Sequence, residues 1–219
     1  MIKLSKRLEK IAEFVEKDDT VLDIGCDHAL LDIYLANKYS KIYYASDLRE
    51  SALDMARSNI KKYSCDKVVL RCGNGLDVLE EKMDINTIVI SGMGYLSIIG
   101  ILRNIKHLKN INKLIIQSNS NSEIVRKFIL KNGFYIDKEH IVLDKNIYYI
   151  ITSFKRGKKK YSNLDKEIGI MNDDILKDYI NIEIKKNNVL LSIVPKKEIF
   201  RRMKIKRKLK YLNKKKNSM

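Results

Sequence analysis

The stretch Val21-Leu22-Asp23-Ile24-Gly25-Cys26-Asp27-His28-Ala29 decides the fold of this chain. It joins a short apolar run to a helix-like segment through Gly25, where the backbone can turn without a Cβ clash and a nucleotide-like ligand can approach. The dinucleotide fingerprint G-x-G-x-x-G is absent, because Asp27 stands in place of its second glycine. The loop therefore predicts a nucleoside site that does not hold a pyrophosphate.

Asp27 also bears on the charge of the ligand. A carboxylate at this place would repel a pyrophosphate, which rests on a helix N-terminus, but it would not repel a cationic sulfonium such as S-adenosylmethionine. We therefore expect that cofactor rather than a nicotinamide dinucleotide. A second interpretation, in which the loop is only a turn and Asp27 caps the following helix, stays open.

Short apolar runs and helix-like segments alternate around this loop. The runs typical of buried strands are 21–24, 42–45, 68–70, 88–90 and 114–116. Helical patterns cover 4–15, 29–38, 49–62, 95–105 and 121–132. This βα alternation predicts a doubly wound parallel sheet of the α/β class.

The pattern changes at Gly133. Two β-rich runs, Phe134 to Val142 and Ile147 to Phe154, have the spacing of an antiparallel hairpin. A parallel sheet that ends in such a hairpin is the layout of class I S-adenosylmethionine-dependent methyltransferases, by analogy of fold. We expect a Rossmann-like domain over 1–156 and a basic helical, coiled-coil-like domain over 157–219, with helices over 168–194 and from Pro195 to about residue 212.

The charge of the chain points to a polyanionic partner. Its 219 residues carry 44 Lys and Arg against 27 Asp and Glu, a net charge of +17. Residues 196–219 hold twelve of the basic residues and a single acid, Glu198. Nucleic acid is the expected partner, although a solvated charged helix is the plainer interpretation of a lysine run.

Several classes of protein are disfavoured. The first residues lack the apolar core of a signal peptide, and the most apolar stretch, 88–102, is shorter than the roughly 20 residues of a spanning helix. Cys26, Cys65 and Cys72 form no C-x-x-C, which argues against disulfides and zinc. We expect a cytoplasmic protein without a metal or a membrane partner, either a monomer or a weak dimer.

Further candidate residues follow the second and third strands. Asp47, in Ser46-Asp47-Leu48, lies 22 residues after Gly25, where a carboxylate accepts both ribose hydroxyls of a nucleoside; it also stands where it can cap the next helix. In Gly73-Asn74-Gly75, Asn74 is expected near the adenine amine, with the ring against Leu76, unless this segment is only a turn.

The fourth and fifth strands also end in candidate segments. Ser91-Gly92-Met93-Gly94 offers a glycine lip over which an acceptor can reach the cofactor. Gln117-Ser118-Asn119 brings two amides that can pair with a purine. Because the carboxyl ends of parallel strands share one edge, we expect all these segments to converge in one pocket.

These residues together resemble a known family. Leu4-Ser5-Lys6-Arg7-Leu8, the loop from Asp23 to Leu31, Asn74-Gly75-Leu76, Gly92-Met93-Gly94 and Gln117-Ser118-Asn119 are similar to the bacterial TrmK family. The resemblance implies a tRNA (adenine-N1)-methyltransferase that acts on adenosine 22 of the D arm. It also implies S-adenosylmethionine as cofactor and a helical C-terminal extension.

Three positions depart from the family pattern. Asn74 replaces an aspartate, Tyr95 follows the lip in place of a glycine, and Ser118 replaces a proline. We expect weaker cofactor contact at Asn74, a narrower entrance or a stacking ring at Tyr95, and a looser loop around Asn119. A methyltransferase of another RNA position or of a small molecule, and a catalytically silent RNA-binding protein, therefore stay open as alternatives.

The chemistry implied by the resemblance needs no general base. N1 of adenine attacks with its lone pair, so positioning supplies most of the catalysis, but the base must first leave its pair or stack. Asp27 is predicted to accept a hydrogen bond from the adenine amine and to stabilise the charge that develops on the ring. His28 is predicted to orient Asp27 or to contact RNA. In a competing assignment, Asp27 touches the cofactor or caps the helix.

The basic residues are predicted to bind tRNA phosphates by counterion release. Met93, Gly94, Tyr95, Gln117 and Asn119 are expected to contact the acceptor base. The expected phosphate contacts outside the pocket are Lys3, Lys6, Arg7, Arg201 and Arg202.

Overall fold

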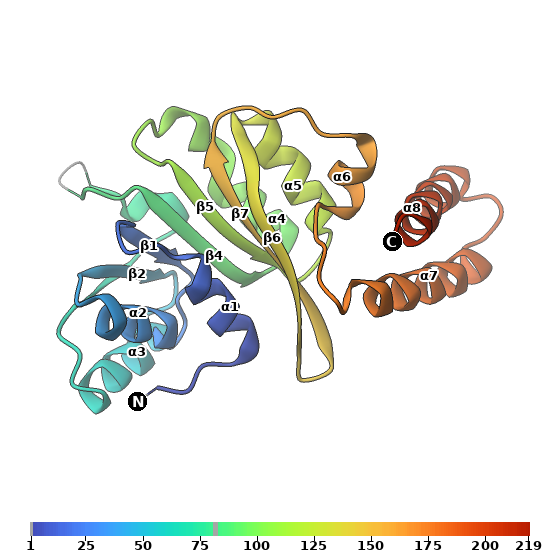
Figure 1. Cartoon of the computed structure of the whole chain (residues 1–219). Coiled ribbons are helices and arrows are strands. Elements are labelled where there is room, and N and C mark those ends of the chain that lie inside the picture. The colour runs from blue at the N-terminus through green and yellow to red at the C-terminus, as the bar shows by residue number, and fades with distance from the viewer. Residues whose placement is uncertain (1, 81–82) are drawn as a thin grey trace.

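The protein is built on one seven-stranded sheet, seen in a computed structural model that describes residues 2–80 and 83–219 (Figure 1). The strand order is β3-β2-β1-β4-β5-β7-β6, with β1 to β5 parallel and β7 antiparallel to both β5 and β6. The predicted doubly wound sheet with a terminal hairpin is therefore confirmed. The strands are β1 Val21–Ile24, β2 Tyr43–Asp47, β3 Val68–Cys72, β4 Thr87–Met93, β5 Lys113–Ser118, β6 Phe134–Asp144 and β7 Ile147–Arg156.

Helices cover both faces of the sheet. The first face packs against α1 Lys6–Phe14, α2 Leu30–Tyr39 and α3 Glu50–Lys62, through residues such as Val21 and Val89. The second face packs against α4 Tyr95–Ile101, the 3₁₀ helix Leu102–His107 and α5 Ser122–Lys131, through residues such as Leu22 and Ile88. Neighbouring strand residues thus bury opposite faces, as the continuous apolar runs require.

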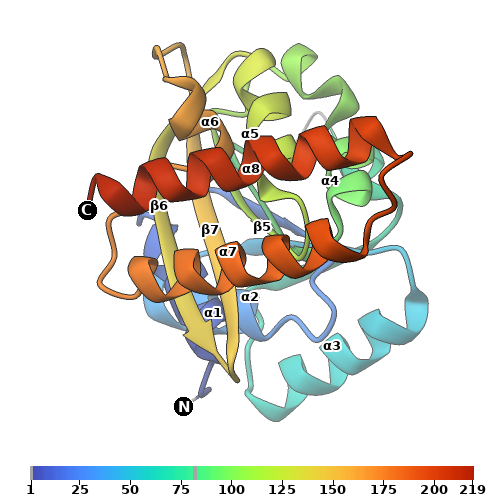
Figure 2. The same cartoon turned by 90° about the vertical axis from the view of Figure 1, so that its right-hand side faces the viewer.

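The chain after β7 forms helices α6 Asn163–Ile168, α7 Leu176–Ile193 and α8 Ile199–Asn217. The predicted helix over 168–194 is wrong at its start, because the chain leaves the helical conformation at Gly169, with φ of 102°, and becomes helical again only at Leu176. The second helix continues past the predicted end at residue 212, since the basic segment that follows remains helical. Figure 2 shows α7 and α8 running alongside each other across one end of the sheet.

A buried ion pair fixes this C-terminal part to the sheet. Glu139 on β6 accepts hydrogen bonds from the Arg126 guanidinium, at 2.6 Å from Nη2 and 3.0 Å from Nε, and from the Thr152 hydroxyl at 2.8 Å. Its second oxygen accepts the Ile170 backbone N–H at 2.7 Å. A Cβ at Gly169 would collide with that oxygen, which explains the glycine at this turn.

Apolar contacts complete the attachment. Ile141 and Ile150 of the β6–β7 hairpin are buried together with Met171, Ile180 and Leu212 from the C-terminal segment. A second small cluster, Val194, Ile205 and Leu209, holds α7 and α8 to each other. The two C-terminal helices therefore depend on each other and on the sheet for burial of their apolar faces.

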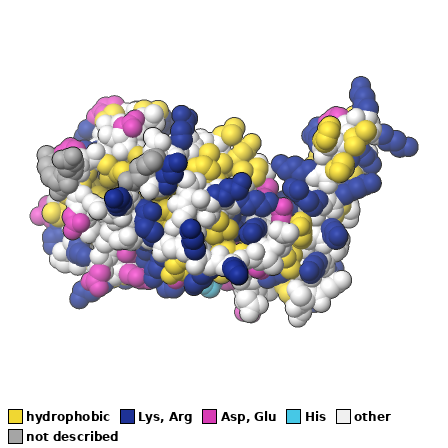
Figure 3. All heavy atoms as spheres, turned by 90° about the horizontal axis from the view of Figure 1, so that it is seen from above, with side chains coloured by type: hydrophobic (Ala, Val, Ile, Leu, Met, Phe, Trp, Pro, Cys, Tyr) yellow, Lys and Arg dark blue, Asp and Glu magenta, His cyan; other side chains and the backbone are white. Residues whose placement is uncertain are grey.

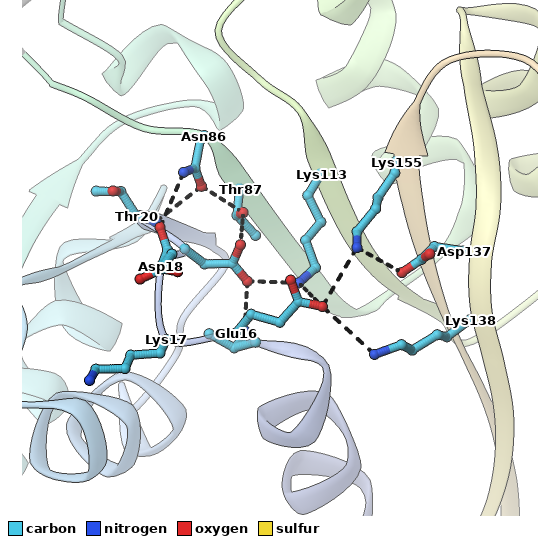
Figure 4. A network of polar contacts seen from close by, with 12 residues as sticks. Glu16, Lys17, Asp18, Thr20, Asn86, Thr87, Lys113, Asp137, Lys138 and Lys155 are labelled. Carbon is cyan, nitrogen blue, oxygen red and sulfur yellow. Dashed lines mark hydrogen bonds and ion pairs between the residues drawn. The ribbon is translucent and has the colours of Figure 1, made fainter.

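A second ionic network lies at the amino ends of the strands (Figure 4). The buried Lys113 ammonium lies 2.8 Å from Asp19 Oδ2 and 3.5 Å from Glu16 Oε1. Partial burial raises the pKa of Glu16, but the charges of Lys113, Lys155 and Lys138 outweigh it and hold that pKa below its ordinary value. The network ties the turn after α1 to β5 and to the terminal hairpin.

The three cysteines are free thiols, of which Cys26 and Cys65 are buried and Cys72 is exposed. Within 2–80 and 83–219, no helix has the length and apolar character needed to cross a membrane. Over the same residues, His, Cys, Asp and Glu side chains form no group of three or more that could hold a metal ion.

We expect Glu139→Gln to destabilise the protein strongly, because it leaves the Arg126 charge buried without a counter-ion. Loss of one partner of a buried pair typically costs about 3–5 kcal/mol. Equilibrium unfolding in urea measures the change. The matched control is Glu13→Gln, which removes the carboxylate of an exposed pair with Lys10 and should leave the unfolding curve in place. Equal stability of both variants would contradict the anchoring role of Glu139.

Candidate active site

One cavity of about 980 Å³ opens at the carboxyl ends of β1 to β4. It lies where the strand order reverses between β1 and β4, the usual ligand site of an open α/β sheet. The structure brings most of the predicted pocket residues together in its walls: Arg7, Asp23, Gly25, Asp27, His28, Asp47, Leu48, Asn74, Gly75, Ser91, Gly92 and Met93.

The turn after β1 is held in an unusual backbone conformation. Gly25, Asp27 and Ala29 have φ of 79°, 50° and 53°. A Cβ at Gly25 would collide with the Met93 methyl group, so the close approach of the β1 and β4 loops requires glycine there. Backbone strain at a non-glycine residue such as Asp27 is typical of functional turns.

Asp27 does not cap α2, so the capping alternative left open by the sequence is wrong. The N-cap is Ala29, and no side chain caps the helix. The Asp27 carboxylate is instead largely exposed to the cavity, 3.5 Å from His28 Nε2 and 3.6 Å from an Arg49 guanidinium nitrogen. It therefore retains free lone pairs for a ligand.

Asp47 anchors two loops of the site. Its buried carboxylate accepts the Arg49 backbone N–H at 2.9 Å and the Asp27 backbone N–H at 3.4 Å. The predicted capping of α3 is replaced by this arrangement, in which Arg49 itself is the N-cap without a side-chain cap. A carboxylate fixed in this way at the end of β2 keeps acceptor capacity toward the cavity.

Two further carboxyl groups lie beneath the turn, Asp23 in the cavity wall and the fully buried Asp32 on α2. Burial raises the pKa of Asp23 to about 7, against the charge of Arg7 and a hydrogen bond from Asp32. Burial and the Asp23 charge raise the pKa of Asp32 still further. Because no N–H or O–H of another described residue reaches either Asp32 oxygen, Asp32 holds the proton and donates it to Asp23.

Gln117 braces the glycine lip from below. Its fully buried side chain accepts the Gly92 backbone N–H at 3.0 Å and the Arg7 guanidinium at 2.6 Å, and it donates to Asn119 Oδ1 at 3.0 Å. Asn119 in turn donates to the Gly92 carbonyl at 2.7 Å. The prediction that these two amides pair with a purine is corrected for Gln117, because its amide is already occupied inside the protein.

Gly94 and Tyr95 lie beside the cavity and do not line it. Tyr95 begins α4 with its ring half-buried, and its backbone N–H donates to the Ser120 hydroxyl at 3.4 Å. Asn74 is exposed in the cavity wall, with Leu76 beside it. The adenine position expected from the sequence is thus open to a ligand, whereas Tyr95 stands at its rim.

Arg7 belongs to the pocket, which corrects its predicted place on an outer phosphate-binding surface. Its guanidinium reaches Gln117, lines the cavity and lies 5.4 Å from the centre of the Tyr149 ring. Lys6, at the start of α1, and Lys3, which precedes the helix, are exposed. Nothing in the apolar spacing of α1 indicated that Arg7 alone turns inward.

Arg202 is also corrected. Its guanidinium donates to the carbonyls of Leu191 and Val194 and so closes the end of α7, which occupies the donors that a phosphate would need. Arg201 remains exposed and pairs with Glu198 at 3.1 Å. The two neighbouring arginines therefore differ in role.

Three cavity residues with polar side chains, Arg49, Ser97 and Arg103, were not predicted from the sequence. Arg49 could have been found, because it follows Asp47 by two residues at the start of a helix. Ser97 and Arg103 lie after the lip in and beyond α4, and only the path of that helix brings them to the cavity.

We expect Asp32→Asn to flatten the pH dependence of stability. The folded protein retains a proton that an ordinary aspartate releases near pH 4, so the free energy of unfolding falls as the pH rises from about 4 to about 7. An amide donates to Asp23 without needing that proton. Urea unfolding of both proteins across this window should show the variant gaining stability relative to the parent, on the order of 1 kcal/mol or more.

The comparison isolates this pair. The lowered pKa of Glu16 acts in the opposite direction, adding stability as the pH rises, but it is common to both proteins. A constant difference in stability at every pH would contradict the shared proton.

Comparison with known proteins places the chain in a family. Residues 4–152 match the family model described as Methyltransferase domain. The chain is 31% identical to MG248 of Mycoplasma genitalium over 179 residues, which is 79% of each chain. It is 27% identical to the tRNA (adenine(22)-N(1))-methyltransferase of Bacillus subtilis over 175 residues, 78% of this chain and 73% of that one.

Solved structures agree with this result. M. capricolum TrmK in complex with S-adenosyl-homocysteine superposes with a TM-score of 0.86 at 25% identity, covering 98% of both chains. Streptococcus pneumoniae Sp1610 in complex with S-adenosyl-L-methionine gives a TM-score of 0.86 at 28% identity, over 97% of this chain and 99% of the other. The chain therefore belongs to the methyltransferase-domain family and, within it, to the TrmK group that its sequence motifs indicated.

Proposed function

We propose that this S-adenosylmethionine-dependent methyltransferase transfers a methyl group to N1 of adenosine 22 in tRNA. The activity is that of the B. subtilis relative, which the chain matches over most of the length of both proteins. The observation that carries the proposal is the single cavity at the carboxyl ends of β1 to β4, whose wall holds Asp23, Asp27 and Asp47 beside the Gly92 lip.

The residues of the cavity fit S-adenosylmethionine. Its acidic wall and the missing glycine fingerprint suit a cationic ligand without phosphates. Asp47 would hold the ribose hydroxyls, with Leu48 beside it, and Asn74 with Gly75 would hold the adenine. Asp23, Gly25, Ser91 and Gly92 would surround the methionine part, where Gly25 leaves backbone space that no other residue would leave.

When bound, S-adenosylmethionine supplies an electrophilic methyl group on a sulfonium. The N1 lone pair of adenine attacks this carbon in line, the bond to sulfur breaks, and the positive charge passes to the adenine ring. No proton has to leave before the attack, so the protein's contribution is to position the base and to stabilise the new charge.

Asp27 is placed for the second task. Its carboxylate faces the cavity, and we assign it the hydrogen bond from the exocyclic amine of the target adenine. His28 and Arg49, at 3.5 and 3.6 Å, hold the carboxylate in this direction and are positioning residues. The strained backbone of Asp27 aims the side chain out of the turn instead of into a helix cap.

The target base has to leave its pair or stack before N1 can be reached. The exposed cations of α8, together with Lys3 and Lys6, are proposed to hold the tRNA backbone while Met93, Gly94 and Tyr95 border the entrance for the base. Since tRNA is an intracellular substrate, we place the enzyme in the cytoplasm, as a monomer or a weak dimer.

Asp27→Ala is expected to lower kcat for tRNA methylation by about 10²–10³-fold, because a preorganised partner of the developing charge is lost. Binding of S-adenosylmethionine, measured by calorimetry, should persist. Asp54→Asn, an exposed carboxylate on α3 outside the cavity, is the matched control and should act like the parent. Mass-spectrometric mapping of the methyl group on tRNA tests the reaction itself. Methylation at the parental rate by the Asp27 variant would remove this residue from the mechanism.

Neutralising Lys206, Lys210 and Lys214 to Gln should weaken tRNA binding and reduce its salt dependence. The three side chains are exposed, one helical turn apart along α8, so their loss leaves the packing of the hairpin intact. The slope of log K against log salt is expected to fall by about one for each lost phosphate contact. Lys109→Gln, in the loop before β5, is the control. An unchanged slope in the triple variant would count against the phosphate surface.

A further inference from the structure

The end of the α7–α8 hairpin carries apolar side chains that no part of the described protein covers. Phe200 is 90% exposed, and its neighbours are each more than half exposed. We call this set the apolar tip; its members are Val189, Ile193, Ile199, Phe200 and Met203. Figure 3 shows apolar side chains gathered at this end of the molecule, with Lys and Arg side chains around them.

The apolar tip is not needed to hold the hairpin together. Val194, Ile205 and Leu209 are buried between the two helices, and Arg202 closes the end of α7. Phe200 adds nothing to this packing, because its ring lies in solvent. An exposed set of large apolar side chains that the fold does not require is typical of a contact surface.

The surroundings of the apolar tip are strongly cationic. Lys196, Lys197, Arg201 and Lys204 are exposed beside it, and Glu198, which pairs with Arg201, is the acid in this segment. A bare aromatic ring among cations is the combination that binds single-stranded nucleic acid, because the cations hold phosphates and the ring stacks on a base.

We propose that the apolar tip binds an unstacked nucleobase of the tRNA, with Phe200 stacked on the base and the flanking cations on the adjoining phosphates. The inference rests on the proposed function for the identity of the RNA. It assigns to the hairpin a base contact in addition to the phosphate contacts of α8. Recognition of RNA through loops depends on such splayed bases, which a regular duplex does not offer.

The place of the hairpin agrees with a shared substrate. Figure 2 shows the α7–α8 connection on the side of the molecule that carries α3 and α4. These two helices begin at Glu50 and Tyr95, directly after the strands whose ends line the cavity. One RNA can therefore reach the cavity with its target base and the apolar tip with a second, distant base.

Charge and burial disfavour other occupants. A second copy of the chain would bring Lys196, Lys197 and Lys204 against the same cations, and like charges at an interface are costly. A membrane surface binds helices with a long apolar stripe, but beyond Met203 the apolar residues of α8, such as Ile205, are buried against α7.

The first test compares Phe200→Ala with Phe200→Tyr. Alanine removes the ring and should weaken tRNA binding roughly 5- to 100-fold, whereas tyrosine keeps the stacking surface and should bind like the parent. The salt slope should stay unchanged in both, since no charge is lost. A perfect RNA duplex should bind the alanine variant and the parent equally. At saturating tRNA, kcat should be retained while KM rises.

A second test uses the absence of tryptophan from the chain. In Phe200→Trp the new indole is the sole tryptophan, and stacking on a base should quench its emission when tRNA is added. Ile42→Trp is the matched control, because Ile42 is also exposed but lies before β2, at the edge of the sheet opposite the cavity. Its emission should not change. Thermal unfolding of each variant verifies that the exposed substitutions leave the fold intact.

Several outcomes would overturn the inference. These are parental tRNA affinity in Phe200→Ala, equal losses in the alanine and tyrosine variants, or no quenching in Phe200→Trp. Loss of self-association in sedimentation, or of binding to phosphatidylglycerol vesicles, with tRNA affinity unchanged would assign the apolar tip to a second copy or to a membrane. If the parent binds tRNA through Phe200 but leaves adenosine 22 unmethylated, the proposed function fails while this inference stands.

Discussion

The site depends on the reversal of sheet growth between β1 and β4. The helix that follows β1 packs on one face of the sheet and the helix that follows β4 on the other, so the two connecting loops diverge and leave a crevice between them. Gly25 lets the loops approach beneath that crevice, where the Met93 methyl group occupies the space of a Cβ. Replacing the glycine would push the loops apart and misplace every group in the cavity wall.

Within the crevice, the chain manages an unusual concentration of carboxyl groups. Asp23 is kept tolerable in the interior by a proton shared with Asp32, and Asp47 by two backbone N–H groups. Asp27 alone faces outward, between cations and a histidine. The resulting field suits a cation without phosphates, because an anionic ligand would meet this acidic wall at close range. The electrostatics of the pocket thus agree with the sulfonium cofactor of the family.

The C-terminal hairpin is joined to this pocket through the sheet. The Arg126–Glu139 pair and the cluster around Met171 attach it to the terminal β6–β7 hairpin, whose other end meets α1 where Asp144 accepts the Arg7 backbone N–H at 3.2 Å. One antiparallel hairpin therefore supports both the helices that carry the basic surface and the helix that inserts Arg7 into the cavity. This connection gives the proposed two-point binding of one RNA a fixed geometry.

The sequence by itself determined the order of the elements, the parallel sheet with its terminal hairpin, the family and the set of loops that form the pocket. These follow from local signals: apolar periods, glycines at forced turns, and motifs at strand ends. Only the tertiary structure decided that Arg7 turns inward, that Gln117 and Arg202 are used up by protein carbonyls and amides, and that Asp23 shares a proton with Asp32. Such roles depend on which groups from distant segments meet in the interior, and a donor already bonded there is lost to a ligand, whatever its residue type predicts.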